Sequence, residues 1–124
     1  MNIFEPDAAW WQKLFGVIDA CDASRFVELL TSDARFRFGN SPTAVGTEAI
    51  LADTASFFAS IASCRHRLIR TWCGSNGLAC EGEVTYGHLD GTTITVPFVN
   101  VLELRGTLIC DYRIYIDNAR SAER

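Results

Sequence analysis

The chain has 124 residues, of which 48% are apolar and 21% charged, and its formal net charge is −4. This size and composition predict a single soluble globular domain over residues 1–124. The negative charge leaves no basic face to neutralise phosphates, which argues against nucleic acid as a partner. No apolar run approaches the roughly 20 residues that span a bilayer, so no membrane partner is expected.

The N-terminal residues lack a basic segment followed by an apolar one, so no signal peptide is expected. No C-x-x-C pair occurs among the five cysteines, which are Cys21, Cys64, Cys73, Cys80 and Cys110. Free thiols in a reducing cytoplasm are therefore the expected state. The two histidines lie far apart, and no His, Asp and Glu cluster has ligand spacing, so neither a metal nor a cofactor is expected.

The first half of the chain carries helical patterns. Asp7 can cap a helix over residues 8–20, and Asp22 can cap a short helix over residues 23–30. Arginine and phenylalanine alternate over residues 34–38, which predicts a strand. A third helix is predicted from Thr47 to about residue 61 by its apolar stripe.

The second half carries strand patterns. Residues 65–73 predict one strand, and three more are predicted at 78–88, 93–104 and 108–117, with turn residues between them. Helices first and strands afterwards indicate an α+β domain. We expect the helices to pack on one face of a mostly antiparallel sheet.

The Asp90-Gly91 dipeptide predicts a two-residue hairpin turn, which sets the register of the strands on either side. In that register Glu83 lies opposite Phe98 and Glu81 lies opposite Asn100. Residues that are opposite across two strands share a face of the sheet. The sequence therefore predicts two carboxylates on the wall of a ligand cavity.

The turn near Gly106 is open to two interpretations. A two-residue turn pairs Leu104 with Ile109, whereas a three-residue loop pairs Leu104 with Leu108. A slip of one residue exchanges the two faces of the last strand. The three-residue loop keeps the apolar residues of that strand on the face of Phe98, and we adopt it; they are Cys110, Tyr112, Ile114 and Ile116.

The order of elements and several motifs resemble the SnoaL-like branch of the nuclear-transport-factor-2-like superfamily. The motifs are Phe36-Arg37-Phe38-Gly39-Asn40, Gly46-Thr47-Glu48-Ala49-Ile50, Phe57-Phe58, His66, Glu83-Val84-Thr85-Tyr86, Asp90-Gly91, Pro97-Phe98-Val99-Asn100-Val101 and Tyr112-Arg113-Ile114-Tyr115-Ile116-Asp117. The resemblance implies a curved sheet wrapped around three helices and a deep apolar pocket. It also implies a homodimer formed through the outer sheet face.

The catalytic sets of well-known relatives are incomplete in this chain. The ketosteroid isomerase pattern needs a carboxylate where Phe38 stands, a tyrosine where Leu14 stands and an acid where Asn100 stands. The limonene epoxide hydrolase pattern needs Arg-x-Asp where the chain has Glu81-Gly82-Glu83, and an aspartate where it has Ile114. Neither activity transfers to this chain.

Three residues are candidates for proton transfer. Glu83 is the leading general base, because a carboxylate beside Phe98 on an enclosed wall is desolvated, and Glu81 would tune it by like charge. The alternative is that both glutamates are solvated or paired with arginine. The resemblance places His66 near the pocket, where it would act as a second acid or base.

Asn100 is the candidate polar anchor for a substrate carbonyl or hydroxyl, or it bonds Tyr112 or Glu81 and stiffens the wall. The remaining candidates for substrate binding are apolar or aromatic residues suited to a flat or cyclic ligand: Phe98, Tyr112, Phe38, Phe58, Trp72 and Ile114.

We expect a cofactor-independent enzyme of isomerase, cyclase or dehydratase type whose substrate is a hydrophobic cyclic small molecule. A non-catalytic protein that binds such a molecule is the alternative. A structural dimer whose cavity is filled by its own side chains is the third hypothesis.

Overall fold

The structure is a computed structural model and describes residues 6–117. Its elements are α1 (Ala8–Asp19), α2 (Ala23–Val27), β1 (Leu30–Phe38), β2 (Ala44–Val45), α3 (Thr47–Ala59), β3 (Ile61–Cys73), β4 (Leu78–His88), β5 (Thr93–Arg105) and β6 (Leu108–Ile116). Within this part of the chain, no helix is long and apolar enough to cross a membrane.

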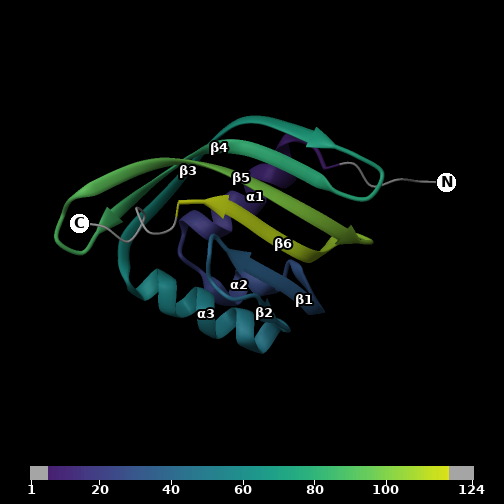
Figure 1. Cartoon of the computed structure of the whole chain (residues 1–124), viewed down its shortest axis with the longest axis horizontal. Helices are drawn as coiled ribbons and strands as arrows, with labels where there is room; N and C mark the ends of the chain where they lie inside the picture. Colours follow the sequence, from purple (N-terminus) through teal and green to yellow (C-terminus); the bar gives the residue numbers. More distant parts are fainter. Residues whose placement is uncertain (1–5, 118–124) are drawn as a thin grey trace.

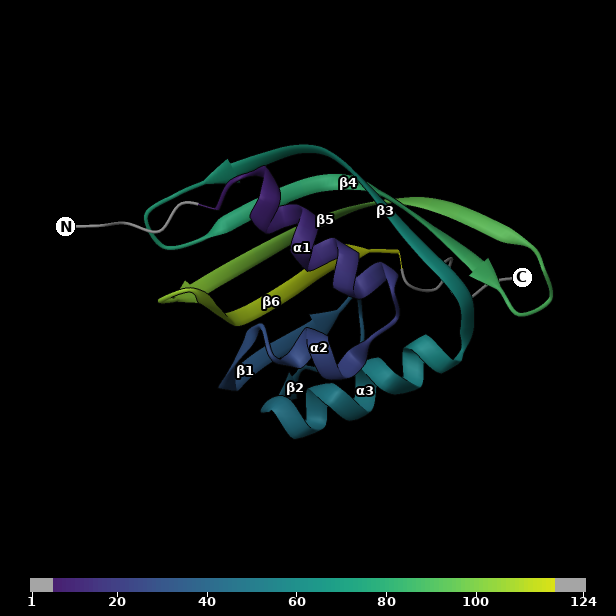
Figure 2. The ribbon, with the colours of Figure 1, turned by 180° about the vertical axis from the view of Figure 1, so that it is seen from behind.

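One sheet contains all six strands, in the order β2-β1-β6-β5-β4-β3. The pair β1–β6 is parallel and the other neighbours are antiparallel. The long strands arch over the helices (Figure 1), and α1 lies along the concave side of the arch when seen from behind (Figure 2). This arrangement confirms the predicted α+β class and the curved sheet wrapped around three helices.

Both predicted caps of the first helices are present. Asp7 Oδ1 accepts a hydrogen bond from the backbone N–H of Trp10 at 3.0 Å, and Asp22 Oδ1 accepts one from Arg25 at 3.1 Å. Each carboxylate satisfies a backbone donor that a helix start leaves without a partner. The helix α2 is shorter than predicted, because the chain joins the sheet at Leu30.

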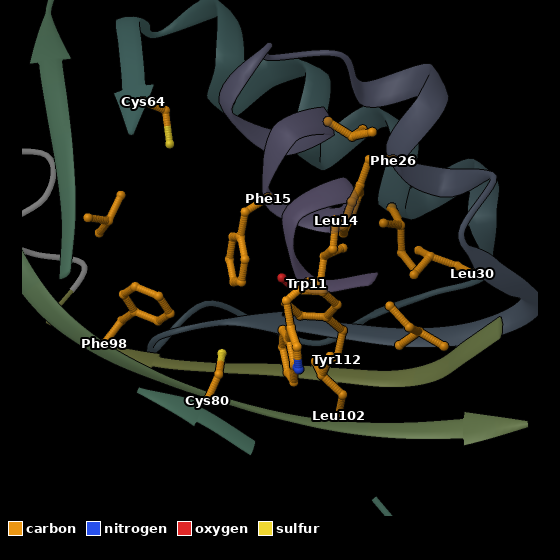
Figure 3. Packing of buried hydrophobic residues seen from close by; sticks show 14 of the residues in the cluster. Trp11, Leu14, Phe15, Phe26, Leu30, Cys64, Cys80, Phe98, Leu102 and Tyr112 are labelled. Atoms are coloured by element: carbon orange, nitrogen blue, oxygen red, sulfur yellow. The ribbon is translucent and has the colours of Figure 1, made fainter. Parts of the chain in front are cut away.

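The core lies between the concave sheet face and the helices. Phe26 of α2 packs edge-on against the rings of Phe36 and Tyr112, at centroid distances of 5.7 and 5.5 Å. Phe15 of α1 points toward Phe98 of β5 (Figure 3), with their ring centroids 5.9 Å apart. These aromatic contacts hold α1 and α2 against different strands of the sheet.

The hairpin between β4 and β5 differs from the prediction by one residue. Its loop contains three residues, because the backbone N–H of His88 donates to Thr92 O at 2.7 Å and Gly91 adopts a φ of 91°. Glu83 is therefore opposite Pro97, and Gly82 is opposite Phe98. The predicted register is wrong, since one extra loop residue moves every side chain of β4 to the other face.

The turn between β5 and β6 also differs, but with the opposite consequence. It is a two-residue Gly106-Thr107 turn, since Arg105 pairs with Leu108. A bulge at Cys110 then adds one residue to β6, after which Tyr112 pairs with Leu102. The predicted loop length is wrong. The predicted face of Tyr112 and of the apolar residues after it is nevertheless correct, because the bulge shifts the register by one more residue and so returns these side chains to the inner face.

Gly82 sits where no side chain fits. A Cβ there would collide with the backbone oxygen of Arg67 and would lie 3.0 Å from the ring of Phe98. We expect Gly82→Ala to lower the free energy of unfolding by about 1–3 kcal/mol, a typical cost of overpacking.

The matched control is Gly16→Ala in α1, where a Cβ meets nothing within 4 Å. This change should raise stability by about 0.5–1 kcal/mol, because glycine weakens a helix interior. Urea unfolding measures whether the free energy of unfolding falls in Gly82→Ala and rises in Gly16→Ala. A Gly82→Ala protein as stable as the wild type would contradict the close approach of β3 and β4.

Candidate functional site

The concave sheet face and α3 enclose a cavity of about 590 Å³. Its lining is mainly apolar and aromatic, as ligand cavities commonly are. The structure therefore leaves space that the chain's own side chains do not fill. Seven residues predicted from the sequence line this cavity: Phe38, Phe58, His66, Phe98, Asn100, Tyr112 and Ile114.

His66 of β3 is bonded to Asp19, the last residue of α1. The ring Nδ1 lies 2.6 Å from Asp19 Oδ1, and the backbone N–H of His66 donates to Asp19 Oδ2 at 2.9 Å. Phe15 and Phe98 flank the imidazole, with centroid distances of 4.6 and 5.2 Å. Two hydrogen bonds and two aromatic contacts therefore fix the position of this ring.

The bond to Asp19 determines which ring nitrogen of neutral His66 carries the proton. A carboxylate accepts, so Nδ1 is the donor and Nε2 keeps its lone pair. Nε2 has no hydrogen-bond partner within residues 6–117. It also does not belong to the fully buried side-chain N and O atoms of this range that have no partner. Since His66 lines the cavity, Nε2 is the nitrogen that can exchange a proton with a bound molecule.

Sequence reasoning missed Asp19, which lies 47 residues before His66. One local signal was available. Asp19 ends α1, and that helix has no basic residue in its last turn. A carboxylate is unfavourable at a helix C-terminus, where the backbone carbonyls are unpaired. Such a break of a local rule is typical of functional sites.

Asn100 of β5 is the second polar feature of the cavity. Its Nδ2 donates to the hydroxyl of Tyr112 at 3.3 Å. Its Oδ1 is the one buried side-chain N or O atom within residues 6–117 that has no partner. A buried acceptor without a donor is costly, by about 1–3 kcal/mol, unless a ligand or water satisfies it. Bonding to Tyr112 was one of the predicted alternatives for Asn100.

The buried thiols and phenols around the cavity are protonated near neutral pH. Burial raises the pKa of Cys80 to about 12, and it also raises the pKa of Tyr86. Burial, with the nearby Asp19 carboxylate second, raises the pKa of the Cys64 thiol. Because the thiolate is the reactive form, neither Cys64 nor Cys80 is suited to nucleophilic catalysis.

The two glutamates predicted on the cavity wall lie on the outer face of the sheet instead. Glu83 Oε1 accepts from Arg67 Nη2 at 2.8 Å, and Glu81 Oε1 lies 3.1 Å from Arg70 Nε. The carboxylates are 42% and 40% exposed. The placement of Glu83 and Glu81 on the wall is wrong, because the three-residue loop inverts β4. The alternative of arginine pairs is correct.

Trp72 does not line the cavity either. It lies near the end of β3, opposite Ala79, and is 50% exposed. The guanidinium of Arg70 sits 6.0 Å from its ring centroid. The placement of Trp72 among the residues that line a ligand cavity is therefore wrong. The register between β3 and β4 shifts between Leu68 and Arg70, which reverses the alternation beyond that point.

The fold and the cavity define a cone-shaped α+β protein whose interior cavity is lined mainly by apolar and aromatic side chains. Residues 4–112 match the model of the SnoaL-like domain family. The chain therefore belongs to the SnoaL-like family. No curated protein matches the chain.

Solved structures share this fold at low sequence identity. A protein of unknown function from Burkholderia pseudomallei, described as nuclear-transport-factor-2-like, has a TM-score of 0.80, 15% identity and 90% coverage of both chains. A putative polyketide cyclase from Xanthomonas campestris has a TM-score of 0.78, 14% identity and 90% coverage of both chains. TerC, co-crystallised with polyporic acid, has a TM-score of 0.74 and 16% identity, covering 86% of this chain and 88% of its own.

Proposed function

We propose that this chain is a cofactor-independent enzyme of isomerase, cyclase or dehydratase type that moves protons on a hydrophobic cyclic small molecule. One observation carries the proposal: an imidazole fixed by a carboxylate at 2.6 Å lines an apolar cavity. Membership of the SnoaL-like family supports this general class.

His66 takes the role of general base that the sequence suggested for Glu83. Its Nε2 lone pair accepts a proton from the bound molecule, and Asp19 stabilises the imidazolium that forms. The same nitrogen can then return the proton to another atom of the molecule. Asp19 acts through His66 and does not contact the reacting atoms in this scheme, so it is a positioning residue.

Asn100 and Tyr112 hold the polar end of the substrate. In the observed orientation the pair offers an acceptor, Asn100 Oδ1, and a donor, the Tyr112 hydroxyl hydrogen. A substrate hydroxyl suits both, because it donates to Oδ1 and accepts from the phenol. Burial raises the pKa of Tyr112, so its hydroxyl keeps its proton for this role.

Thermal shifts against a panel of steroids, terpenoids and aromatic polyketides test whether the cavity binds such a molecule; polyporic acid belongs in the panel because TerC crystallised with it. A ligand at 100 times its dissociation constant stabilises a protein by about 2.7 kcal/mol. Compounds that stabilise the wild type are then assayed for turnover.

Two neighbouring residues of β6 give a matched pair of variants for this panel. Ile114→Trp fills the cavity and should abolish the shift. Tyr115→Trp places the same side chain on the outer face, where Tyr115 is 52% exposed, and should keep it. A shift that survives in Ile114→Trp would place binding outside the cavity and overturn the proposal.

A non-catalytic binding protein is the second candidate, favoured by the unpartnered Asn100 Oδ1. A donor group of a bound ligand can satisfy that atom whether or not a reaction follows. Binding in the cavity without turnover of any bound compound would decide for this candidate.

We further propose that two chains pair through the outer sheet face. Three half-exposed apolar side chains lie on that face, namely Trp72, Val99 and Tyr115. Arginine and glutamate pairs surround them, as in Arg67–Glu83. Alternating charges around an apolar centre suit a twofold interface, in which the same patch meets itself.

Sedimentation of the wild type should therefore show a dimer, and Val99→Arg should shift it to a monomer by burying a charge at the interface. Leu89→Arg is the matched control, since Leu89 is 69% exposed but lies in the β4–β5 loop. A monomeric wild type would contradict the proposed interface.

A further inference from the structure

Three metal-ligand atoms from distant parts of the sequence converge beside the cavity. They belong to Asp19, Cys64 and His66, each of which offers one ligand atom within 4.8 Å of the other two. Cys64 is buried, and the other two residues are half-buried. The cysteine of this set is Cys64 of β3, which points into the interior in Figure 3.

We propose that Asp19, Cys64 and His66 form a binding site for a zinc-like divalent ion, with water as the fourth ligand. One sulfur, one nitrogen and one oxygen donor suit zinc, which accepts all three in tetrahedral sites. The sequence indicated no metal site, because Asp19 lies 47 residues before His66. The fold supplies the third ligand.

One of the ligand-to-ligand distances already matches that of a tetrahedral centre, and a second must widen. With bonds of about 2.0–2.3 Å, ligand atoms lie roughly 3.3–3.7 Å apart. The Sγ of Cys64 is 3.7 Å from His66 Nδ1. The Nδ1 to Oδ1 distance of 2.6 Å belongs to a hydrogen bond and must widen by about 0.7 Å when an ion replaces the proton.

The ligands are also held in place by their surroundings. Cys64 and His66 are two residues apart on β3, so both side chains project from the inner face of that strand. The backbone N–H of His66 binds Asp19 Oδ2, which leaves Oδ1 directed at the ring. Such support of the ligands is what metal sites require.

An ion can approach from solvent without crossing the cavity. A groove between α1 and β3 is lined by Asp19 and His66, with Phe15 and Leu68 beside them. Gly16 also lines the groove, and a Cβ on it would meet nothing within 4 Å. The groove is therefore open next to Asp19, where a water molecule can complete the coordination.

Binding of the ion changes the protonation of Cys64 and the tautomer of His66. The Cys64 thiol loses its proton to solvent, because the thiolate is the ligand. Neutral His66 exchanges its Nδ1 proton for the metal and gains one at Nε2, so the ring stays neutral. One proton is therefore released for each ion bound, and Asp19 remains a carboxylate throughout.

The tautomer change has a consequence for the reaction, and this consequence rests on the proposed function. With the ion on Nδ1, His66 Nε2 carries a hydrogen and is a donor. It can no longer accept a proton from the substrate. The ion would then act as an inhibitor that switches off the base while leaving the cavity intact.

Titration of the ligand-free protein with Co²⁺ tests the site directly. We expect a thiolate-to-cobalt charge-transfer band that saturates at one equivalent, with one proton released per ion in weakly buffered solution. Cys64→Ser should abolish the band, and Asp19→Asn should weaken binding at least tenfold. Cys73→Ser, which changes an exposed thiol of the same strand, should leave the band unchanged.

The result that overturns the site is a wild type without the band at one equivalent, or a band that persists in Cys64→Ser. Circular dichroism of each variant shows that it is folded before the titration is interpreted. The band is measured without substrate, so its presence or absence is independent of catalysis. If the band forms but Zn²⁺ fails to inhibit turnover, the site stands and the role of His66 as base falls.

Discussion

Replacing His66 by asparagine is expected to lower turnover by about 10²–10⁴-fold, the usual contribution of a positioned general base. Asparagine places a nitrogen donor close to the position of Nδ1, so it can keep the bond to Asp19. It has no counterpart of Nε2, so the proton acceptor is lost. Ligand affinity, measured by thermal shift, should change by no more than about threefold, equivalent to roughly 0.7 kcal/mol.

Glu83→Gln is the control for this experiment. Glu83 is paired with Arg67 on the outer face, so removing its charge should leave turnover unchanged. Equal loss of turnover in both variants would point to a general effect on stability. Loss in Glu83→Gln alone would show that the outer face carries the chemistry, contrary to the observed register.

The double variant Asn100→Leu/Tyr112→Phe is expected to be more stable than the wild type and to bind ligand at least about tenfold more weakly, equivalent to roughly 1.4 kcal/mol. It removes the unpartnered Asn100 Oδ1, and it also removes the hydroxyl that Asn100 contacts. Replacing both partners of a buried hydrogen bond by apolar groups of similar shape can be stabilising, here by about 1 kcal/mol.

The single variant Asn100→Leu separates the two contributions. It leaves the buried Tyr112 hydroxyl without a partner, so it should be less stable than the double variant. Urea unfolding gives the stabilities, and the panel compounds give the affinities. A double variant that is less stable than the wild type and binds equally well would show that this pair stiffens the wall and holds no ligand.

The architecture was predictable because local patterns agree with one another. Capping aspartates precede the first two helices, and the strands alternate with period two. The inner face of β6 was predicted correctly although the preceding turn was not. The two-residue turn and the bulge at Cys110 each exchange the two faces once, so together they restore the predicted face and Tyr112 and Ile114 reach the cavity.

The catalytic candidates were not predictable to the same extent. Asp-Gly suits a two-residue hairpin, but Gly91 also suits the positive φ that a three-residue loop requires. The difference of one residue places Glu83 on one face or on the other. The alternation within β4 favours the outer face, because Glu83 alternates with the apolar residues Val84 and Tyr86, but the two-residue turn was given more weight. The contact of Asp19 with His66 depends on how α1 packs on β3, which no short-range pattern encodes.

The tautomer of His66 tests the central claim most directly. Long-range ¹H–¹⁵N correlation spectra, recorded where the ring is neutral, distinguish a protonated Nδ1 from a protonated Nε2. The structure predicts the proton on Nδ1, bonded to Asp19, with Nε2 free as the acceptor. In Asp19→Asn this preference should weaken. A proton on Nε2 in the metal-free wild type would contradict the account, because His66 would then have no lone pair to offer the substrate.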